Sequence, residues 1–205
     1  AAFMDAAEGC PYYAPLMCCL FLGLREGEAL GLAWEHIDFE NGKALICQQL
    51  QKEKTAHGAF YIKHSTKTGQ SRTLDLPDFL MDILKEEQHR QMLARIAAGS
   101  AWGNEWGLCF TDALGGCINP HTLWSNFKRI AKSIGLPDAR VHDLRHTNAT
   151  LALVNGVDLK TVQANLGHST AAFTLQRYVH ATEQARRAAA DQMQQLYENQ
   201  IRKAQ

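Results

Sequence analysis

The stretch that decides the fold runs from Val141 to His180 and reads VHDLRHTNATLALVNGVDLKTVQANLGHSTAAFTLQRYVH. Its capping residues and apolar spacing predict three helices. The first runs from about Asp143 to Val154 and is closed by Asn155-Gly156; Leu144, Leu151 and Val154 form its predicted apolar face. The second runs from Asp158 to Leu166 and stops at Gly167, and the third begins at Ser169 or Thr170.

Four side chains in this stretch can carry chemistry on a phosphate. His142 and Arg145 are three residues apart, so they project from neighbouring positions on one helix. His168 follows a helix stop, and Tyr178 falls near the end of the third helix. The two non-bridging oxygens of a phosphodiester suit two arginine forks, and a tyrosine beside cations can become a nucleophile. The stretch therefore predicts half of a site, which needs a second arginine and a proton donor from elsewhere.

The second arginine is predicted directly after a buried helix. The apolar run Tyr12 to Leu24 is too short to cross a bilayer and reads as a core helix that ends at Gly23. Arg25 follows it, and Glu28 is within helical reach to hold the guanidinium in one orientation. We find no signal peptide and, because the chain opens without Met, we expect a fragment.

Two antiparallel strand pairs are predicted in the middle of the chain. Residues 37–40 and 43–46 flank an Asn-Gly turn and read as a tight hairpin. Residues 59–62 and 72–76 flank the polar turn 65–70, which predicts a second pair with Lys67 at its tip. A lysine on a turn is usually only a solvated residue, so this stretch alone does not assign it a function.

Three further helices are expected outside the central stretch. One runs from Pro77-Asp78 to about Ala97, a second begins at Asn119-Pro120 and ends before Gly135, and the last covers Ala181 to Gln205. The predicted core positions of the first are Phe79, Leu80, Ile83, Leu84, Met92, Leu93 and Ile96, and those of the second are Leu123, Phe127, Ile130 and Ile134. Lys128, Arg129 and Lys132 lie on the other side of the second helix.

Charge is unevenly divided along a chain whose formal net charge is zero. Residues 1–40 hold one basic against seven acidic residues, residues 41–75 hold six against two, and residues 121–187 hold nine against four. The two basic blocks coincide with the segments that carry the candidate chemistry, which is compatible with nucleic acid or with an ordinary solvated surface. The six cysteines show no CxxC spacing, so we expect reduced core residues of a cytoplasmic protein and no metal.

Taken in order, these motifs resemble those of the tyrosine recombinases, most closely the integrases of phages and conjugative transposons. The first arginine motif of that family is matched by GLREGEALGLAW, with Arg25 and the supporting Glu28, and its hairpin lysine by Lys67-Thr68 with Arg72. The remaining motifs are matched by HDLRHT, which holds His142 and Arg145, by LGH with His168, and by RYVH with Tyr178.

The resemblance implies a fold and a mechanism. The fold would be α+β and mostly α-helical, with a small antiparallel β-sheet packed on a helical core. Tyr178 would attack a DNA phosphodiester and form a 3′-phosphotyrosyl link, while Arg25 and Arg145 bind the phosphate. Lys67 would protonate the leaving 5′-oxygen, His142 would act as general acid/base, and His168 would hydrogen-bond the phosphate. Strand exchange would proceed through a Holliday junction without a cofactor. Arg72, Lys128 and Lys132 would contact the DNA.

The resemblance also implies an organisation and partners. Residues 1–180 would be the catalytic domain, without the N-terminal DNA-binding domains, and residues 181–205 a helical tail that docks on a neighbouring subunit. The partner would be double-stranded DNA, bound by a homotetramer, and the free protein would be a monomer or a weak oligomer. Accessory DNA-bending or directionality factors would take part, in the cytoplasm near the nucleoid and away from membranes.

Two rival functions remain at this point. A type IB topoisomerase would use much the same site to relax DNA, and a helix-turn-helix module without catalysis would explain residues 157–178 but not Arg25 or Lys67. Each residue also has a structural alternative: Arg145 as an ion pair with Asp143, His168 as a helix-terminus ligand, Tyr178 as a core aromatic.

Overall fold

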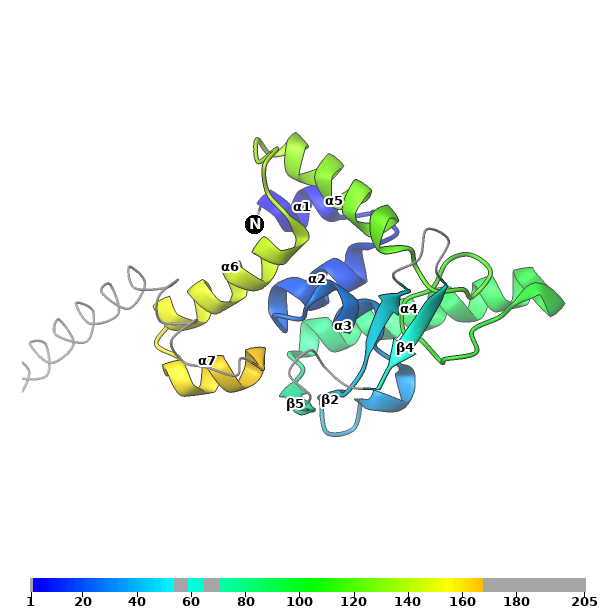
Figure 1. Cartoon of the computed structure of the whole chain (residues 1–205), viewed down its shortest axis with the longest axis horizontal. Helices are drawn as coiled ribbons and strands as arrows, with labels where there is room; N and C mark the ends of the chain where they lie inside the picture. Colours follow the sequence, from blue (N-terminus) through cyan, green and yellow to red (C-terminus); the bar gives the residue numbers. More distant parts are fainter. Residues whose placement is uncertain (1, 54–58, 65–70, 168–205) are drawn as a thin grey trace, which may run out of the picture. The chain divides into compact units, whose positions relative to one another are not determined.

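The structure is a computed structural model that describes residues 2–53, 59–64 and 71–167. The chain divides into two compact units, residues 1–148 and 149–205. Helices dominate, and the strands form two small antiparallel sheets (Figure 1). This confirms the predicted mostly helical α+β class. The predicted domain boundary at residue 180 lies outside the described residues and stays a prediction.

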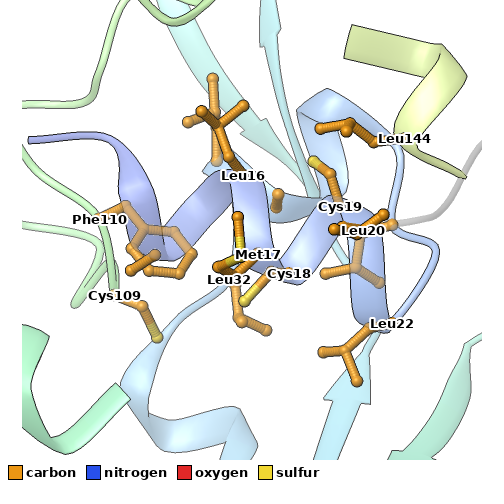
Figure 2. Packing of buried hydrophobic residues seen from close by; sticks show 14 of the residues in the cluster. Leu16, Met17, Cys18, Cys19, Leu20, Leu22, Leu32, Cys109, Phe110 and Leu144 are labelled. Carbon is orange, nitrogen blue, oxygen red and sulfur yellow. The ribbon is translucent and has the colours of Figure 1, made fainter. Parts of the chain in front are cut away.

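Helix α2 (Tyr13–Phe21) forms the centre of the first unit. Its residues from Ala14 to Leu20 are all buried, which confirms the predicted core helix. Pro15 is tolerated because the N–H groups of a first turn have no partner within the helix. The chain leaves the helix through Gly23, which adopts a left-handed φ of 62°. Figure 2 shows α2 side chains packed among residues from distant segments, including Leu32, Cys109, Phe110 and Leu144.

Other helices of the first unit pack on α2 or on one another. Helix α1 (Ala2–Ala7) contacts α5 (Pro120–Ser133), and α2 contacts both α3 (Glu26–Leu30) and α4 (Asp78–Ala98) (Figure 1). The N-cap predicted for α5 is confirmed, since the Asn119 side chain accepts a hydrogen bond from the backbone N–H of His121. The buried face of α5 consists of Leu123, Phe127, Ile130 and Ala131.

Two glycines let a strand pack directly against α3. A Cβ at Gly31 would lie 2.6 Å from the backbone nitrogen of Leu50, and one at Gly27 would lie 2.9 Å from the Leu50 carbonyl oxygen. Leu50 belongs to β3 (Gln49–Lys52), a strand that the sequence analysis did not predict. The spacing of the two glycines, one helical turn apart, was the sequence signal for this close approach.

The strand pairing differs in part from the prediction. Strands β1 (Ile37–Asp38) and β2 (Lys43–Ile46) form the expected hairpin after the 3-10 helix η1 (Trp34–His36). The predicted pairing between the segments on either side of residues 65–70 is wrong. Within the described part of the chain, β4 (Phe60–Lys63) pairs with β3, and β5 (Arg72–Asp75) pairs with β2. Strand β4 therefore pairs with β3, which precedes it in the sequence and was not predicted, and not with β5.

Helix α4 has the predicted bounds but not the predicted core face. Leu80 and Leu84 are fully buried as expected, whereas Met92, Leu93 and Ile96 are at least half exposed and Phe79 is 41% exposed. After Leu84 the buried positions of the helix belong to Glu87 and Gln91. The Gln91 amide donates to the carbonyls of Leu108 and Cys109, so polar contacts replace the expected apolar ones. A short 3-10 turn, η2 (Gly99–Ala101), follows.

Helix α6 (Val141–Val154) begins in the first unit and ends in the second. In the second unit it forms a small cluster with α7 (Leu159–Leu166), made of Ala149, Leu153, Val162 and Leu166. Of the three positions on the predicted apolar face, Leu144 is buried, whereas Leu151 and Val154 are 51% and 47% exposed. Asp158 caps α7 and Gly167 ends it in the left-handed region, both as predicted. The predicted third helix and the tail lie outside the described residues.

Candidate active site

The candidate site is built around the carboxylate of Glu28, in the first turn of α3. Arg25 immediately precedes this helix, and its backbone N–H donates to Glu28 Oε2 at 3.0 Å. The Arg25 guanidinium donates to Glu28 Oε1 at 2.6 Å. The predicted pairing is confirmed, and because the Glu28 side chain has no exposed surface, it holds Arg25 in one place.

A second guanidinium reaches the same carboxylate from the sheet. Arg72, the first residue of β5, donates through both terminal nitrogens, to Oε1 at 3.2 Å and to Oε2 at 2.7 Å. Burial alone would raise the pKa of Glu28, but the hydrogen bonds and charges of Arg72 and Arg25 outweigh it. They lower the pKa of Glu28 to about 2, so this buried carboxyl is ionised at neutral pH.

A third guanidinium approaches from α6. Arg145 is only 1% exposed; its Nη1 donates to the carbonyl of Gly23 at 2.5 Å and lies 3.9 Å from Glu28 Oε2. The amide of Asn148 donates to the Phe21 carbonyl, so α6 is tied to the end of α2 at two points. Asp143 accepts instead from Arg140, through the backbone and the guanidinium. The alternative of an Arg145–Asp143 ion pair is therefore not what the structure contains.

These contacts bring together residues that are far apart in sequence, and the resulting cluster has an excess of positive charge. Within residues 2–53, 59–64 and 71–148, three guanidinium groups meet one carboxylate at this place. A buried or half-buried cluster of this kind attracts an anion strongly, because solvent screens it little. Planar guanidinium forks match the oxygens of a phosphate, so the arrangement is suited to hold a phosphodiester.

His142 lies in the first turn of α6, three residues before Arg145. Its ring meets that of His146 edge to face, with the ring centroids 4.6 Å apart. Burial and the neighbouring His146 lower the pKa of His142 to about 4. The charges of Arg145 and Arg25 act in the same direction, against a smaller opposite effect of Asp143. His142 is thus neutral at pH 7 in the free protein.

The other predicted site residues divide into two groups. Lys67, His168 and Tyr178 lie outside the described residues, so their roles stay predictions. Lys128 is described, and its ammonium donates to the backbone carbonyls of Pro137 and Ala139, while Lys132 is exposed. The DNA contacts expected of Lys128, Lys132 and Arg72 stay predictions as well.

Sequence reasoning missed two features of the site. Arg72 was expected to touch DNA, and its fork on Glu28 was not foreseen because residues 44 positions apart meet only through the β2–β5 pairing. His146 was not among the predicted site residues, although its spacing of one helical turn from His142 was the available signal.

The structure also bears on metals, cysteines and membranes. Among the described residues, no group of three or more His, Cys, Asp and Glu side chains is arranged to hold a metal ion. All six cysteines are described and unpaired, with Cys18, Cys19 and Cys109 buried. No helix in the described part of the chain combines the length and apolar character needed to span a bilayer.

Solved structures share this fold. A Tn1549 transposon integrase in complex with transposon right end DNA superposes with a TM-score of 0.74 at 22% identity, covering 93% of this chain and 62% of that one. The XerA recombinase superposes with a TM-score of 0.68 at 20% identity, covering 94% and 61%. At these identities the likeness establishes the fold.

Sequence relatives extend the likeness. A "Tyrosine recombinase XerC-like" protein of Caldanaerobacter subterraneus subsp. tengcongensis is 34% identical over 201 residues, covering 94% of this chain and 51% of the relative. An "Integrase" of Saccharopolyspora erythraea is 33% identical over 224 residues, covering 85% and 51%. The chain thus spans about half the length of these curated relatives. Residues 1–185 match the profile of the phage integrase family, and the chain belongs to that family.

Proposed function

We propose that this chain carries the catalytic site of a site-specific DNA recombinase that breaks and rejoins strands through a 3′-phosphotyrosyl intermediate. The observation that carries the proposal is the cluster of Arg25, Arg72 and Arg145 around the buried Glu28, with the neutral His142 beside it. The names of the relatives support recombination over DNA relaxation or DNA binding without catalysis.

The arginines bind and stabilise the reacting phosphate. Arg25 and Arg145 contact its non-bridging oxygens and offset the negative charge that grows as phosphorus becomes five-coordinate. Because Glu28 fixes Arg25 and the Gly23 carbonyl fixes Arg145, both are oriented before DNA arrives. Such preorganisation reduces the reorganisation needed in the transition state.

Proton transfers accompany the attack. The phenolic oxygen of Tyr178 forms a bond to phosphorus as the bond to the 5′-oxygen breaks. His142, neutral in the free protein, accepts the tyrosine proton, and Lys67 donates a proton to the departing 5′-oxygen. His168 donates a hydrogen bond to the phosphate.

Rejoining reverses these steps with another strand. The 5′-hydroxyl of a partner strand attacks the phosphotyrosyl link, Tyr178 is released, and the number of phosphate ester bonds is unchanged. Neither ATP nor metal is consumed in this scheme. A second round on the other strands resolves a Holliday junction, in a homotetramer on double-stranded DNA with accessory DNA-bending or directionality factors. The cytoplasmic location near the nucleoid stays a prediction.

A duplex nicked just beyond the cleavage position tests the nucleophile, because the short leaving strand diffuses away and traps the covalent adduct. We expect wild-type protein to form an adduct that survives denaturation, and Tyr178→Phe to form none while still binding DNA. Tyr61→Phe is the matched control: Tyr61 is an exposed tyrosine of β4 whose hydroxyl bonds Gln51, and its loss should leave the adduct unchanged. An adduct that persists in Tyr178→Phe would contradict the assignment.

The same preparation separates recombination from relaxation. The recombinase reading expects joined products between two target sites, and relaxation of a supercoiled plasmid without joining would favour a topoisomerase instead.

A further inference from the structure

We propose that Arg72 is a positioning residue, which saturates Glu28 and thereby leaves Arg25 and Arg145 oriented toward a phosphate. This inference rests on the proposed function and concerns how its arginine cluster is organised. Arg72 acts in this account through a carboxylate and not through contact with DNA.

Strand pairing fixes the backbone of Arg72. Its Cα is in register with Ile46 in the β2–β5 ladder, and β2 also pairs with β1. The side chain is 9% exposed, and its two terminal nitrogens each meet a different oxygen of Glu28. A two-point fork of this kind sets both the distance and the angle of the carboxylate, which a lysine cannot reproduce.

The four hydrogen bonds on Glu28 occupy its acceptor positions. A carboxylate offers about four lone-pair sites. On Oε1 these receive the guanidinium nitrogens of Arg25 and Arg72, and on Oε2 the backbone N–H of Arg25 and the second nitrogen of Arg72. Arg145 remains 3.9 Å from Oε2, close enough for charge attraction but beyond hydrogen-bond distance.

Two consequences follow for the phosphate site. Without Arg72, two acceptor positions on a buried carboxylate would open, and Arg145, whose Nη1 lies 3.9 Å from Oε2, is close enough to move onto them. Drawn onto Glu28, Arg145 would lose the orientation it has on the Gly23 carbonyl. The cluster would also hold two positive charges against one negative instead of three against one, so its attraction for an anion would fall.

A matched control exists elsewhere in the same unit. Arg90 of α4 makes an equivalent fork on Glu87, which is 8% exposed, with nitrogen–oxygen distances of 2.9 and 2.5 Å. This pair has no part in the proposed reaction. Arg90→Gln therefore measures what removing an arginine fork from a buried carboxylate costs the chain in general.

The test compares adduct formation on two nicked duplexes, one with the natural scissile phosphodiester and one with an uncharged methylphosphonate there. The natural ester gains most from the arginines, since only it carries charge. At a concentration of the whole chain that saturates the DNA, we expect Arg72→Gln to slow adduct formation about tenfold to a hundredfold on the phosphodiester. On the methylphosphonate the loss should be only a few-fold, and Arg90→Gln should change both substrates equally.

Arg72→Lys keeps the charge and guards against a variant that fails to fold. We expect Arg72→Lys to fold because the positive charge beside Glu28 is kept. Because lysine lacks the fork, this variant should recover only part of the rate of adduct formation on the phosphodiester. A full rate in Arg72→Lys, or an equal loss on both substrates in Arg72→Gln, would overturn the inference.

Salt dependence distinguishes positioning from direct DNA contact. Each phosphate contact that is lost lowers the slope of log affinity against log salt by about 0.9. In a Tyr178→Phe background, Arg72→Gln should leave that slope unchanged. A slope lowered by about 0.9, the amount for one phosphate contact, would make Arg72 a DNA ligand and overturn the positioning role. If the wild type formed no adduct on the natural ester, the proposed function would fail, and this inference with it.

Discussion

Glu28 and Glu87 are both carboxylates buried in the first unit and both accept an arginine fork, yet their surroundings differ. Glu87 pairs with Arg90, whose side chain is 41% exposed and also reaches the Thr111 carbonyl. Glu28 has no exposed surface and lies among Arg25, Arg72 and Arg145. The first arrangement is balanced in charge and holds two segments together. The second carries surplus positive charge, and that surplus is what distinguishes a candidate anion site from a structural ion pair.

Neutralising Glu28 and Glu87 in turn should give the largest difference in stability between the two sites. Glu28→Gln leaves several buried guanidiniums without their counter-charge, so we expect it to lower the free energy of unfolding by about 3–5 kcal/mol. In Glu87→Gln, Arg90 can turn toward water, so the loss should be about 1–2 kcal/mol. Urea unfolding followed by circular dichroism measures both, and equal losses would remove the distinction between the two sites.

Acid should weaken the Glu28 cluster in a defined pH window. The pKa of Glu28 is about 2 in the folded chain against 4.5 for the ordinary group, so folding favours the ionised form. This contribution is fully present above about pH 4.5 and is lost as the pH falls toward 2, and it amounts to about 3 kcal/mol. Unfolding free energies measured from pH 6 to pH 2 should show the loss in wild type. A Glu28→Gln curve of the same shape would contradict it.

Gly27 and Gly31, in and at the end of the helix that holds Glu28, allow a test of the close packing between α3 and β3. Gly31→Ala would place its Cβ 2.6 Å from the Leu50 nitrogen, so α3 and β3 must separate, at a cost of about 1–3 kcal/mol. Gly103→Ala, where a Cβ meets nothing within 4 Å, should be tolerated. Thermal unfolding of the two variants makes the comparison, and similar melting temperatures would mean that β3 does not pack on α3 as closely as described.

The smallest effect should be felt by His142. NMR titration of the free protein should place its midpoint near pH 4, because burial and nearby positive charge oppose protonation. Removing one of those charges in Arg25→Gln should move the midpoint upward, whereas Arg90→Gln should not move it. A wild-type midpoint at the ordinary histidine value of about 6.5 would show that the surplus charge does not reach His142.

Local features were predictable from the sequence. The bounds of α2, α4 and α7 follow from apolar spacing, proline and capping residues, and the Arg25–Glu28 pair follows from a separation of three residues. Each of these depends on neighbours within one or two helical turns. Such information is contained in any short window of the chain.

Features that depend on distant partners were not predictable in this way. Met92 and Ile96 are as apolar as any core residue, but Gln91 is buried instead because the backbone of Leu108 and Cys109 lies against that face. Strand β4 pairs with β3, a polar stretch without a strong strand pattern. Arg72 reaches Glu28 for the same reason, since strand pairing, not sequence spacing, brings them together.

The central claim is that the arginine cluster presents a DNA phosphate to Tyr178. Protease digestion of the adduct formed on a nicked duplex, followed by mass spectrometry, tests it most directly. The account predicts one modified peptide, containing Tyr178 joined to the 3′-phosphate end of the cleaved strand, with its yield strongly reduced in Arg145→Gln. An adduct on another residue, or a yield that is the same without Arg145, would contradict it.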